Sequence, residues 1–215
     1  MQVVHDVTFG VPAAGTTALL GRNGAGKTTT LRAVLGLTAA TGRVTLAGIA
    51  LHALPTHARI GHGIGYVPED RGVFAALTVA ENLRLAAPEA TGADYDRVYA
   101  LFPDLATRSR QLAGTLSGGQ QQMVALGRVL LRDNRILLVD EPTKGLAPRV
   151  VTEVAQVLAR VAETVPILLV EQNLAVVRRL AHRAVALANG TVAWQGDPGD
   201  LADDTDLAHS LLGVA

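Results

Sequence analysis

The sequence predicts an α/β fold built around a parallel sheet, with a helical lobe inserted into it. Short apolar runs alternate along the chain with longer amphipathic segments, which is the pattern of parallel strands joined by crossover helices. The stretch from about residue 72 to residue 132 differs, because it contains no convincing strand and has a helical pattern. A chain of 215 residues is long enough for one such core with a small lobe. We therefore expect a single domain over residues 1–215, with the helical lobe at about 72–132.

The expected elements can be justified in chain order. Five short apolar runs have the length and composition of buried strands: Thr16–Leu20, Arg43–Ala47, Ile64–Val67, Ile136–Val139 and Ile167–Val170. Two segments have helical spacing, namely Lys27–Leu35, which ends at Gly36, and Val150–Ala162. The dipeptide Asn189-Gly190 is a strong hairpin signal between two late strands, Ala184–Leu187 and Thr191–Trp194. The acidic residues near the end are expected on a solvated helix face: Asp203, Asp204 and Asp206.

The composition argues against several functions. A formal net charge of zero and an aromatic content of only 3% argue against a surface that binds nucleic acid. The absence of cysteine excludes disulfides, thiolate zinc sites and a cysteine nucleophile, and it fits a reducing cytoplasm. The residues after Met1 resemble neither a signal peptide nor a transit peptide, and no apolar run reaches about eighteen residues, so we expect no membrane span. A mean hydropathy of +0.29 indicates that a partner covers some apolar surface.

A glycine-rich loop between the first expected strand and the first expected helix matches the phosphate-binding pattern Gly-four residues-Gly-Lys-Thr. Its residues are Gly21, Arg22, Asn23, Gly24, Ala25, Gly26, Lys27 and Thr28. The glycines let backbone N–H groups converge on phosphate oxygens, and the following helix directs its positive end at the same anion. Lys27 would contact the β- and γ-phosphates, Thr28 would ligate Mg²⁺, and the Thr29 hydroxyl would face the α-phosphate. A chance match is roughly a one-in-a-hundred event in such a chain, so the sequence predicts nucleotide binding.

Two acidic residues follow an expected buried strand. Asp140 directly follows the run and Glu141 comes next, and a carboxylate at a strand end beside a phosphate loop is typical of a Mg²⁺ site in nucleotide hydrolases. Glu141 can then face the γ-phosphate and polarise the attacking water. A strand end that merely meets solvent is the alternative, and the phosphate loop in the same domain favours the catalytic interpretation.

A second anion site is predicted in the helical lobe. The pentapeptide that predicts it is Leu116-Ser117-Gly118-Gly119-Gln120, in which Ser117 is a good N-cap and the two glycines leave the first helical turn open. A capped helix with no ligand is the alternative. Two anion sites for one nucleotide make sense if they meet across a dimer.

With these motifs, the chain resembles the nucleotide-binding subunit of ABC transporters from about Val3 to Leu212. The resemblance implies a RecA-like P-loop NTPase core with an antiparallel β subdomain and an inserted helical subdomain. It implies a head-to-tail homo- or heterodimer in which Ser117 and Gly119 of one subunit close on the γ-phosphate held by Lys27 of the other. Gly118 and Gln120 belong to the same nucleotide-binding motif. Two transmembrane permease subunits and an exported solute-binding protein are the further partners, at the cytoplasmic face of a bacterial membrane.

Three departures from the common ABC pattern narrow this resemblance. Glu69 stands where the family usually has a glutamine, Gln172 stands where it usually has a histidine, and the loop after the acidic pair reads Lys144-Gly145-Leu146-Ala147-Pro148. Together they resemble the shorter ATPase of bacterial high-affinity branched-chain amino acid importers, and urea or short-amide importers share much of the pattern. Glu69 is a possible Mg²⁺ ligand, and Gln172 can donate an amide hydrogen bond to the γ-phosphate. A merely polar residue at the end of a strand is the alternative for Gln172.

Other readings remain open at this point. The strand and the adenine-stacking aromatic residue of the family normally precede the position of Val3, so we expect weakened ATP affinity or a start codon further upstream. The chain could instead be a soluble ABC ATPase acting on ribosomes or DNA, or a weakly hydrolysing partner in a heterodimer. The six histidines match no catalytic position, and their spacings suit no metal cluster, so we expect no zinc site.

Overall fold

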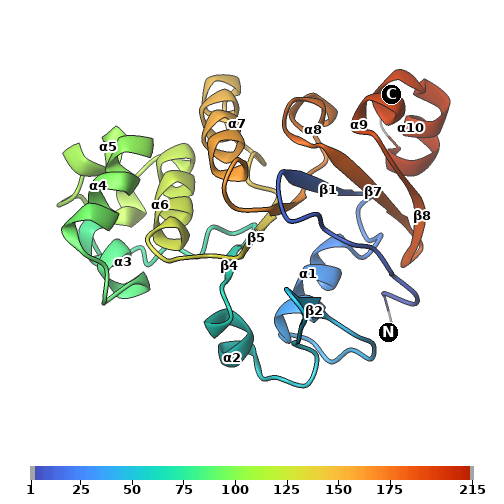
Figure 1. Cartoon of the computed structure of the whole chain (residues 1–215). Coiled ribbons are helices and arrows are strands. Elements are labelled where there is room, and N and C mark those ends of the chain that lie inside the picture. The colour runs from blue at the N-terminus through green and yellow to red at the C-terminus, as the bar shows by residue number, and fades with distance from the viewer. Residues whose placement is uncertain (1–2, 214–215) are drawn as a thin grey trace.

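A computed structural model describes residues 3–213, and its centre is a mostly parallel six-stranded sheet (Figure 1). The strands of this sheet are β1 (Thr16–Leu20), β4 (Ile64–Val67), β5 (Ile136–Asp140), β6 (Ile167–Val170), β7 (Arg183–Ala188) and β8 (Thr191–Gly196). Their order is β4-β5-β6-β1-β7-β8, and only the last pair is antiparallel. Strand β6 therefore lies between β5 and β1, a placement that decides the geometry of the site.

Alternate residues of the central strands pack into apolar cores on the two faces of the sheet. Leu138 and Leu168 pack with α1 (Lys27–Leu35) on one face. Val139 and Leu169 pack on the other face, with α7 (Pro148–Ala162), α8 (Leu174–Leu180) and the helical lobe. The runs are apolar throughout because both faces are covered, as is typical of parallel sheets. Figure 1 shows α1 on one side of the sheet and α7 and α8 on the other.

The segment between β4 and β5 is helical in the described chain. It contains α3 (Val79–Ala86), α4 (Gly92–Leu101), α5 (Pro103–Thr107), a 3₁₀ turn (Ala113–Thr115) and α6 (Gly118–Leu130). Figure 1 shows these helices together at one side of the sheet. The fully buried Asn82 fixes the loop that enters this lobe, because its side-chain amide bonds the backbone N–H and C=O of Phe74 and the C=O groups of Leu77 and Thr78.

The glycine-rich loop leads into the N-terminus of α1, and the other end of this helix is held in place by Arg59. Arg59, in α2 (Thr56–Gly61), is buried and donates hydrogen bonds to the C=O groups of Ala33 and Val34 in the last turn of α1. The same guanidinium bonds the C=O groups of His52 and Leu54. Arg59 therefore satisfies C=O groups that a helix end leaves unpaired, and a cation suits the negative end of the helix dipole.

The fold class is confirmed, and some of the expected elements change. The strand expected at Arg43–Ala47 is shorter, and β2 (Thr45–Leu46) pairs antiparallel with β3 (Ile49–Ala50) as a separate small sheet. Two-residue strands leave too little alternation for a sequence pattern to delimit them. The hairpin forms as predicted, with Asn189 and Gly190 both at positive φ.

The acidic residues near the end of the chain are exposed, but the prediction of one helix face was wrong. Asp203 ends α9 (Pro198–Asp203) and forms an ion pair with Arg178. Asp204 caps α10 (Thr205–Leu212), and Asp206 lies in the first turn of α10. An aspartate at an N-cap ends one helix run and starts another, which explains the break. Within residues 3–213, none of the helices is long and apolar enough to cross a membrane.

Candidate nucleotide site

The phosphate loop forms the predicted cradle between β1 and α1. Gly26 is the N-cap of α1 with φ of 106°, and no described side chain caps this helix. Gly21 has φ of 142°, and a Cβ there would come within 2.4 Å of the Leu187 carbonyl oxygen, so only glycine fits. The N–H groups of the first turn are therefore available to an anion, which is the arrangement that favours phosphate.

Lys27 closes this cradle. Its side chain is buried, and Nζ donates hydrogen bonds to the carbonyl oxygens of Gly21 (2.8 Å) and Arg22 (3.2 Å). Burial lowers the pKa of Lys27, while the charges of Glu141 and Asp140 raise it. The ammonium group thus lies at the centre of the loop with the two carboxylates as its counter-charges.

Asp140 ends β5 with an incompletely satisfied carboxylate. Its Oδ1 accepts a hydrogen bond from the Thr28 hydroxyl (3.2 Å), and its Oδ2 is buried and has no hydrogen-bond partner in the described chain. Burial raises the pKa of Asp140 to about 6, against the opposing effect of the Thr28 hydrogen bond. An unpaired oxygen beside a hydroxyl is the donor set that a hard divalent cation accepts, with substrate phosphates completing its shell. The residues present fit Mg²⁺.

Glu141 and Gln172 come together although 31 residues separate them. Gln172 Nε2 donates to Glu141 Oε1 at 2.5 Å and to Asn23 Oδ1 at 2.7 Å, so it joins the acidic pair to the phosphate loop. The sheet order explains this contact, because β6 lies between β5 and β1 and Gln172 follows β6. Glu141 has φ of 46°, a strained value for a residue other than glycine, and such strain is concentrated at functional sites.

Lys144 also belongs to the site, although no sequence motif predicted it as a site residue. Its Nζ lies 2.5 Å from Glu69 Oε1 and 3.1 Å from Glu141 Oε2, and these hydrogen bonds raise the pKa of Lys144. No hydrogen bond of the described residues joins Glu69 to Thr28 or Asp140. Its residue type was a signal that Lys144 could belong to the site, because Lys27 and Lys144 are the only lysines in the sequence.

The second predicted anion site, the segment 117–120 that we call the signature, lies at the N-terminus of α6. The Ser117 hydroxyl accepts a hydrogen bond from the Gln120 N–H (3.3 Å), and Gln120 Oε1 accepts one from the Ser117 N–H (3.1 Å). A Cβ on Gly119 would come within 2.5 Å of Val150 Cγ1, so glycine permits close packing of α6 against α7. Among residues 3–213, no hydrogen bond joins Ser117, Gly118, Gly119 or Gln120 to the phosphate loop. One chain therefore does not bring the two predicted anion sites together.

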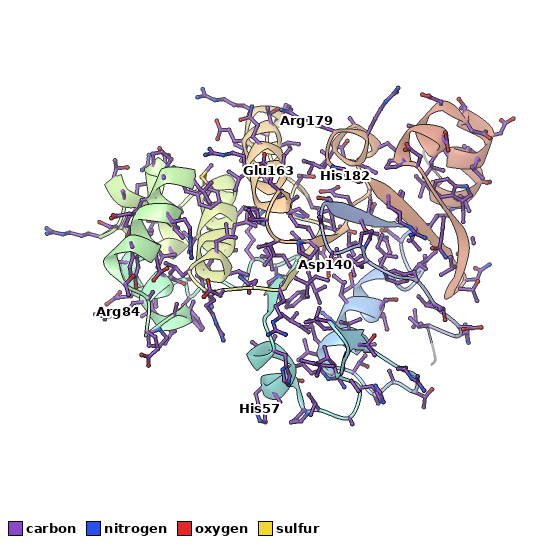
Figure 2. All side chains as sticks on the ribbon, viewed as in Figure 1. His57, Arg84, Asp140, Glu163, Arg179 and His182 are labelled. Atoms are coloured by element: carbon purple, nitrogen blue, oxygen red, sulfur yellow. The ribbon has the colours of Figure 1, made fainter. Side chains whose placement is uncertain are left out.

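Figure 2 shows Asp140 near the middle of the molecule, with His57 and His182 well away from it on opposite sides. Among the described residues, no cluster of three or more His, Cys, Asp or Glu side chains could hold a metal ion.

Comparison with known proteins shows the family to which the chain belongs. A model of the family described as ABC transporter matches residues 4–144. The chain belongs to the ABC transporter family. It is an ATP-binding subunit of that family, the P-loop NTPase fold is confirmed, and the chain is an ATPase like its relatives that power transport. ATP-binding cassettes of this family work as dimers in transporters with membrane permeases.

Two relatives of this ATP-binding subunit match almost its whole length. It is 38% identical over 219 residues to the high-affinity branched-chain amino acid transport ATP-binding protein BraG of Pseudomonas aeruginosa, covering 99% of this chain and 94% of that protein. It is 34% identical over 221 residues to the probable branched-chain amino acid transport ATP-binding protein LivF of Archaeoglobus fulgidus, covering 100% and 94%.

Other importer subunits and solved structures match as well. The thiamine import ATP-binding protein ThiQ of Escherichia coli is 32% identical over 205 residues, covering 92% of this chain and 87% of that protein. A molybdenum import ATP-binding protein of Bradyrhizobium diazoefficiens also matches. A solved structure described as the ATP binding subunit of an ABC transporter superposes with a TM-score of 0.79 at 31% identity, covering 98% and 90% of the two chains.

Proposed function

We propose that this ATPase energises the import of branched-chain amino acids, and that it does so with the residues described above. The resemblance at Glu69, at Gln172 and in the loop after the acidic pair supports this cargo. So does the similarity over almost the whole chain to two branched-chain amino acid transport ATP-binding proteins. One observation carries the hydrolytic mechanism: the Glu141 carboxylate is hydrogen-bonded to Gln172, which also bonds Asn23 of the phosphate loop.

The mechanism follows from these contacts. The N–H groups of the loop, the open end of α1 and Lys27 bind the triphosphate, with Thr29 half-buried in the first turn of the helix. Thr28 and Asp140 would hold Mg²⁺, which neutralises charge on the β- and γ-phosphates when bound. Glu141 accepts the proton of the attacking water, and one N–H of the Gln172 amide orients that carboxylate. The second N–H would turn from Asn23 to the γ-phosphate when ATP binds. Gln172 cannot itself carry a proton near neutral pH, so proton transfer falls to Glu141.

A second copy of an ATPase subunit, identical or related, would complete each site. Its α6 N-terminus provides the serine hydroxyl and the N–H groups that one chain keeps away from its own phosphate loop. Closure of the dimer on ATP and reopening after hydrolysis is the step that would couple chemistry to transport.

The permeases would dock beside the loop that follows β4. A hollow of about 290 Å³ lies between this loop and α6, lined by Pro68, Arg71, Gly72 and Arg128 among others. Arg128 bonds the Gly72 carbonyl oxygen and lies 4.9 Å from the centre of the Phe74 ring. A Cβ on Gly118 would come within 3.3 Å of Arg71 Nη2, so the same loop also reaches the signature. Docking in this hollow could thus move α6, and it would fix the subunit at the cytoplasmic face of a bacterial membrane, with an exported binding protein delivering the cargo.

Glu141→Gln tests the catalytic proposal. The substitution keeps the hydrogen-bonding shape but removes the base, so we expect ATP binding to persist while turnover falls by about a hundredfold or more. The closed dimer should then accumulate with ATP, as measured by size-exclusion chromatography with light scattering. Hydrolysis at the parental rate would remove Glu141 from the mechanism.

A weakly hydrolysing partner subunit is the second candidate. The ion pair between Lys144 and Glu141 favours it, because Lys144 Nζ occupies the Oε2 atom of the proposed base at 3.1 Å. ATPase assays of the chain alone and mixed with a candidate second ATPase distinguish the two roles. A chain that is inactive alone and does not raise the rate of its partner would be a binding subunit only.

The cargo needs a separate measurement. Urea or short-amide import remains the alternative, and matches to thiamine and molybdenum import subunits indicate that the cassette is shared among importers. Uptake of labelled leucine and of labelled urea, compared between parent and Glu141→Gln cells, assigns the cargo. Loss of leucine uptake alone supports the proposal, and loss of urea uptake alone contradicts it.

A further inference from the structure

Glu171 is a buried acid that the mechanism has not yet used. It follows β6 directly, only 3% of its surface is exposed, and it forms no ion pair within residues 3–213. Its Oε1 accepts hydrogen bonds from the backbone N–H (3.2 Å) and the hydroxyl (2.5 Å) of Thr143. Its Oε2 accepts hydrogen bonds from the backbone N–H groups of Gln172 (3.0 Å) and Asn173 (3.1 Å).

These four donors match the capacity of an ionised carboxylate. Such a carboxylate is an acceptor only, with about four lone-pair positions on its two oxygens. A buried charge without a cation is stable only if its hydrogen bonds are complete, and here each oxygen takes two. The shape of the site therefore specifies a carboxylate, since an amide would turn an NH₂ group toward one pair of donors.

The two pairs of donors belong to different loops. Thr143 lies in the loop after β5, two residues beyond Glu141, whereas Gln172 and Asn173 lie in the loop after β6. Glu171 joins these loops across 28 residues of sequence. The backbone of Glu141 is already bonded to the sheet, since its N–H donates to the Val170 carbonyl oxygen (2.9 Å). The carboxylate of Glu171 thus fixes the backbone on both sides of the Gln172–Glu141 contact.

We infer that Glu171 is a positioning residue for ATP hydrolysis, which holds the loop of Glu141 and the loop of Gln172 in register. It acts through these two residues and contacts no phosphate position itself. The inference rests on the roles proposed above for Glu141 and Gln172. Misplacement of a catalytic group by about 1 Å costs a large factor in rate, so such a clamp affects turnover more than binding.

The test is Glu171→Gln in the full chain, with steady-state ATPase kinetics in the most active assembly, alone or with its partner subunit. We expect kcat to fall about tenfold or more while the KM for ATP stays within about threefold, because the phosphate loop is untouched. Thr143→Val removes the hydroxyl donor and keeps the shape, so it should reduce kcat in the same direction by a smaller factor. Thr143→Ser retains the hydroxyl and should retain the rate.

Glu81→Gln is the matched control. Glu81 also accepts hydrogen bonds from the backbone N–H (2.8 Å) and hydroxyl (2.7 Å) of a threonine, Thr78, but the two residues form the capping box of α3 in the helical lobe. The Glu81→Gln variant should lower the unfolding temperature and leave kcat for ATP hydrolysis close to that of the parent. If Glu171→Gln lowers only the unfolding temperature, as the control does, its role is structural and the inference fails.

A double variant provides the second measurement. If Glu171 acts through Gln172, then Glu171→Gln combined with Gln172→Ala should lose little more kcat than Gln172→Ala alone, since effects within one unit are not additive. Full additivity would overturn the inference. Failure of the proposed function is recognised separately, because Glu141→Gln would then hydrolyse ATP at the parental rate whatever Glu171 does.

Discussion

The N-termini of α1 and α6 are the two predicted anion sites, and the structure builds them in opposite ways. At α1 the cap is Gly26, in the left-handed region and without a side-chain cap. At α6 the cap is Ser117, whose hydroxyl and backbone N–H are both satisfied by Gln120 in a capping box. The end of α1 therefore presents unsatisfied N–H groups and needs an anion. The end of α6 folds without a ligand and has to share its hydroxyl when one arrives.

The difference extends to the neighbouring side chains. Around α1 the buried groups are charged or unpaired, namely Lys27 against backbone carbonyls and Asp140 with an orphaned oxygen. At the start of α6, Gly119 packs tightly against the apolar side chain of Val150 in α7, and Gly118 lies beside the Arg71 guanidinium. The first site carries polar groups that substrate must satisfy, and the second is a stable surface that a partner can use. Three substitutions test this contrast.

Lys27→Ala should have the largest effect. It removes a buried cation from the α1 site and leaves the carbonyl groups of Gly21 and Arg22 without their donor. Loss of several charge-assisted hydrogen bonds to phosphate should weaken ATP binding by about a thousandfold. Isothermal titration calorimetry of the purified chain measures it. Unchanged affinity would contradict the site assignment itself.

Ser117→Asp separates the two functions of the α6 N-terminus. Aspartate caps a helix about as well as serine, so the unfolding free energy should change by less than about 0.5 kcal/mol. A negative charge facing the γ-phosphate of the partner should nevertheless reduce turnover by about a hundredfold. Chemical unfolding and ATPase assays are run on the same preparation. A normal rate would show that the signature does not face phosphate.

Asp140→Asn should act on the stability of the α1 site, and in the stabilising direction. The folded-state pKa of Asp140 is raised from 3.8 to about 6, so its contribution to stability is present below about pH 4 and is lost as the pH rises through 6. At pH 7.5 without Mg²⁺ this cost amounts to at most about 3 kcal/mol. The variant should then unfold at a higher temperature than the parent, and the difference should shrink as the pH is lowered toward 4.5. A variant that is less stable than the parent at pH 7.5 would contradict the cost assigned here to the buried Asp140 carboxylate.

The sequence determined the local parts of this protein. The helix Lys27–Leu35 begins and ends where glycines predict, and β4 and β6 match their apolar runs. The phosphate loop, the acidic pair and the signature each span eight residues or fewer, so their local geometry follows from residue type. Short or weakly periodic elements were missed, among them β3, α2 and α8, because a few residues carry little periodic signal.

Only the tertiary structure decided which of these parts touch. The contacts of Gln172 with Glu141 and Asn23, and the clamp of Glu171 on Thr143, depend on β6 lying between β5 and β1. That order arises from how whole strands and helices pack, and no local pattern encodes it. Lys144 likewise becomes a site residue only through its neighbours Glu69 and Glu141. The residue types fix what each group can do, and the packing of the sheet fixes which groups do it together.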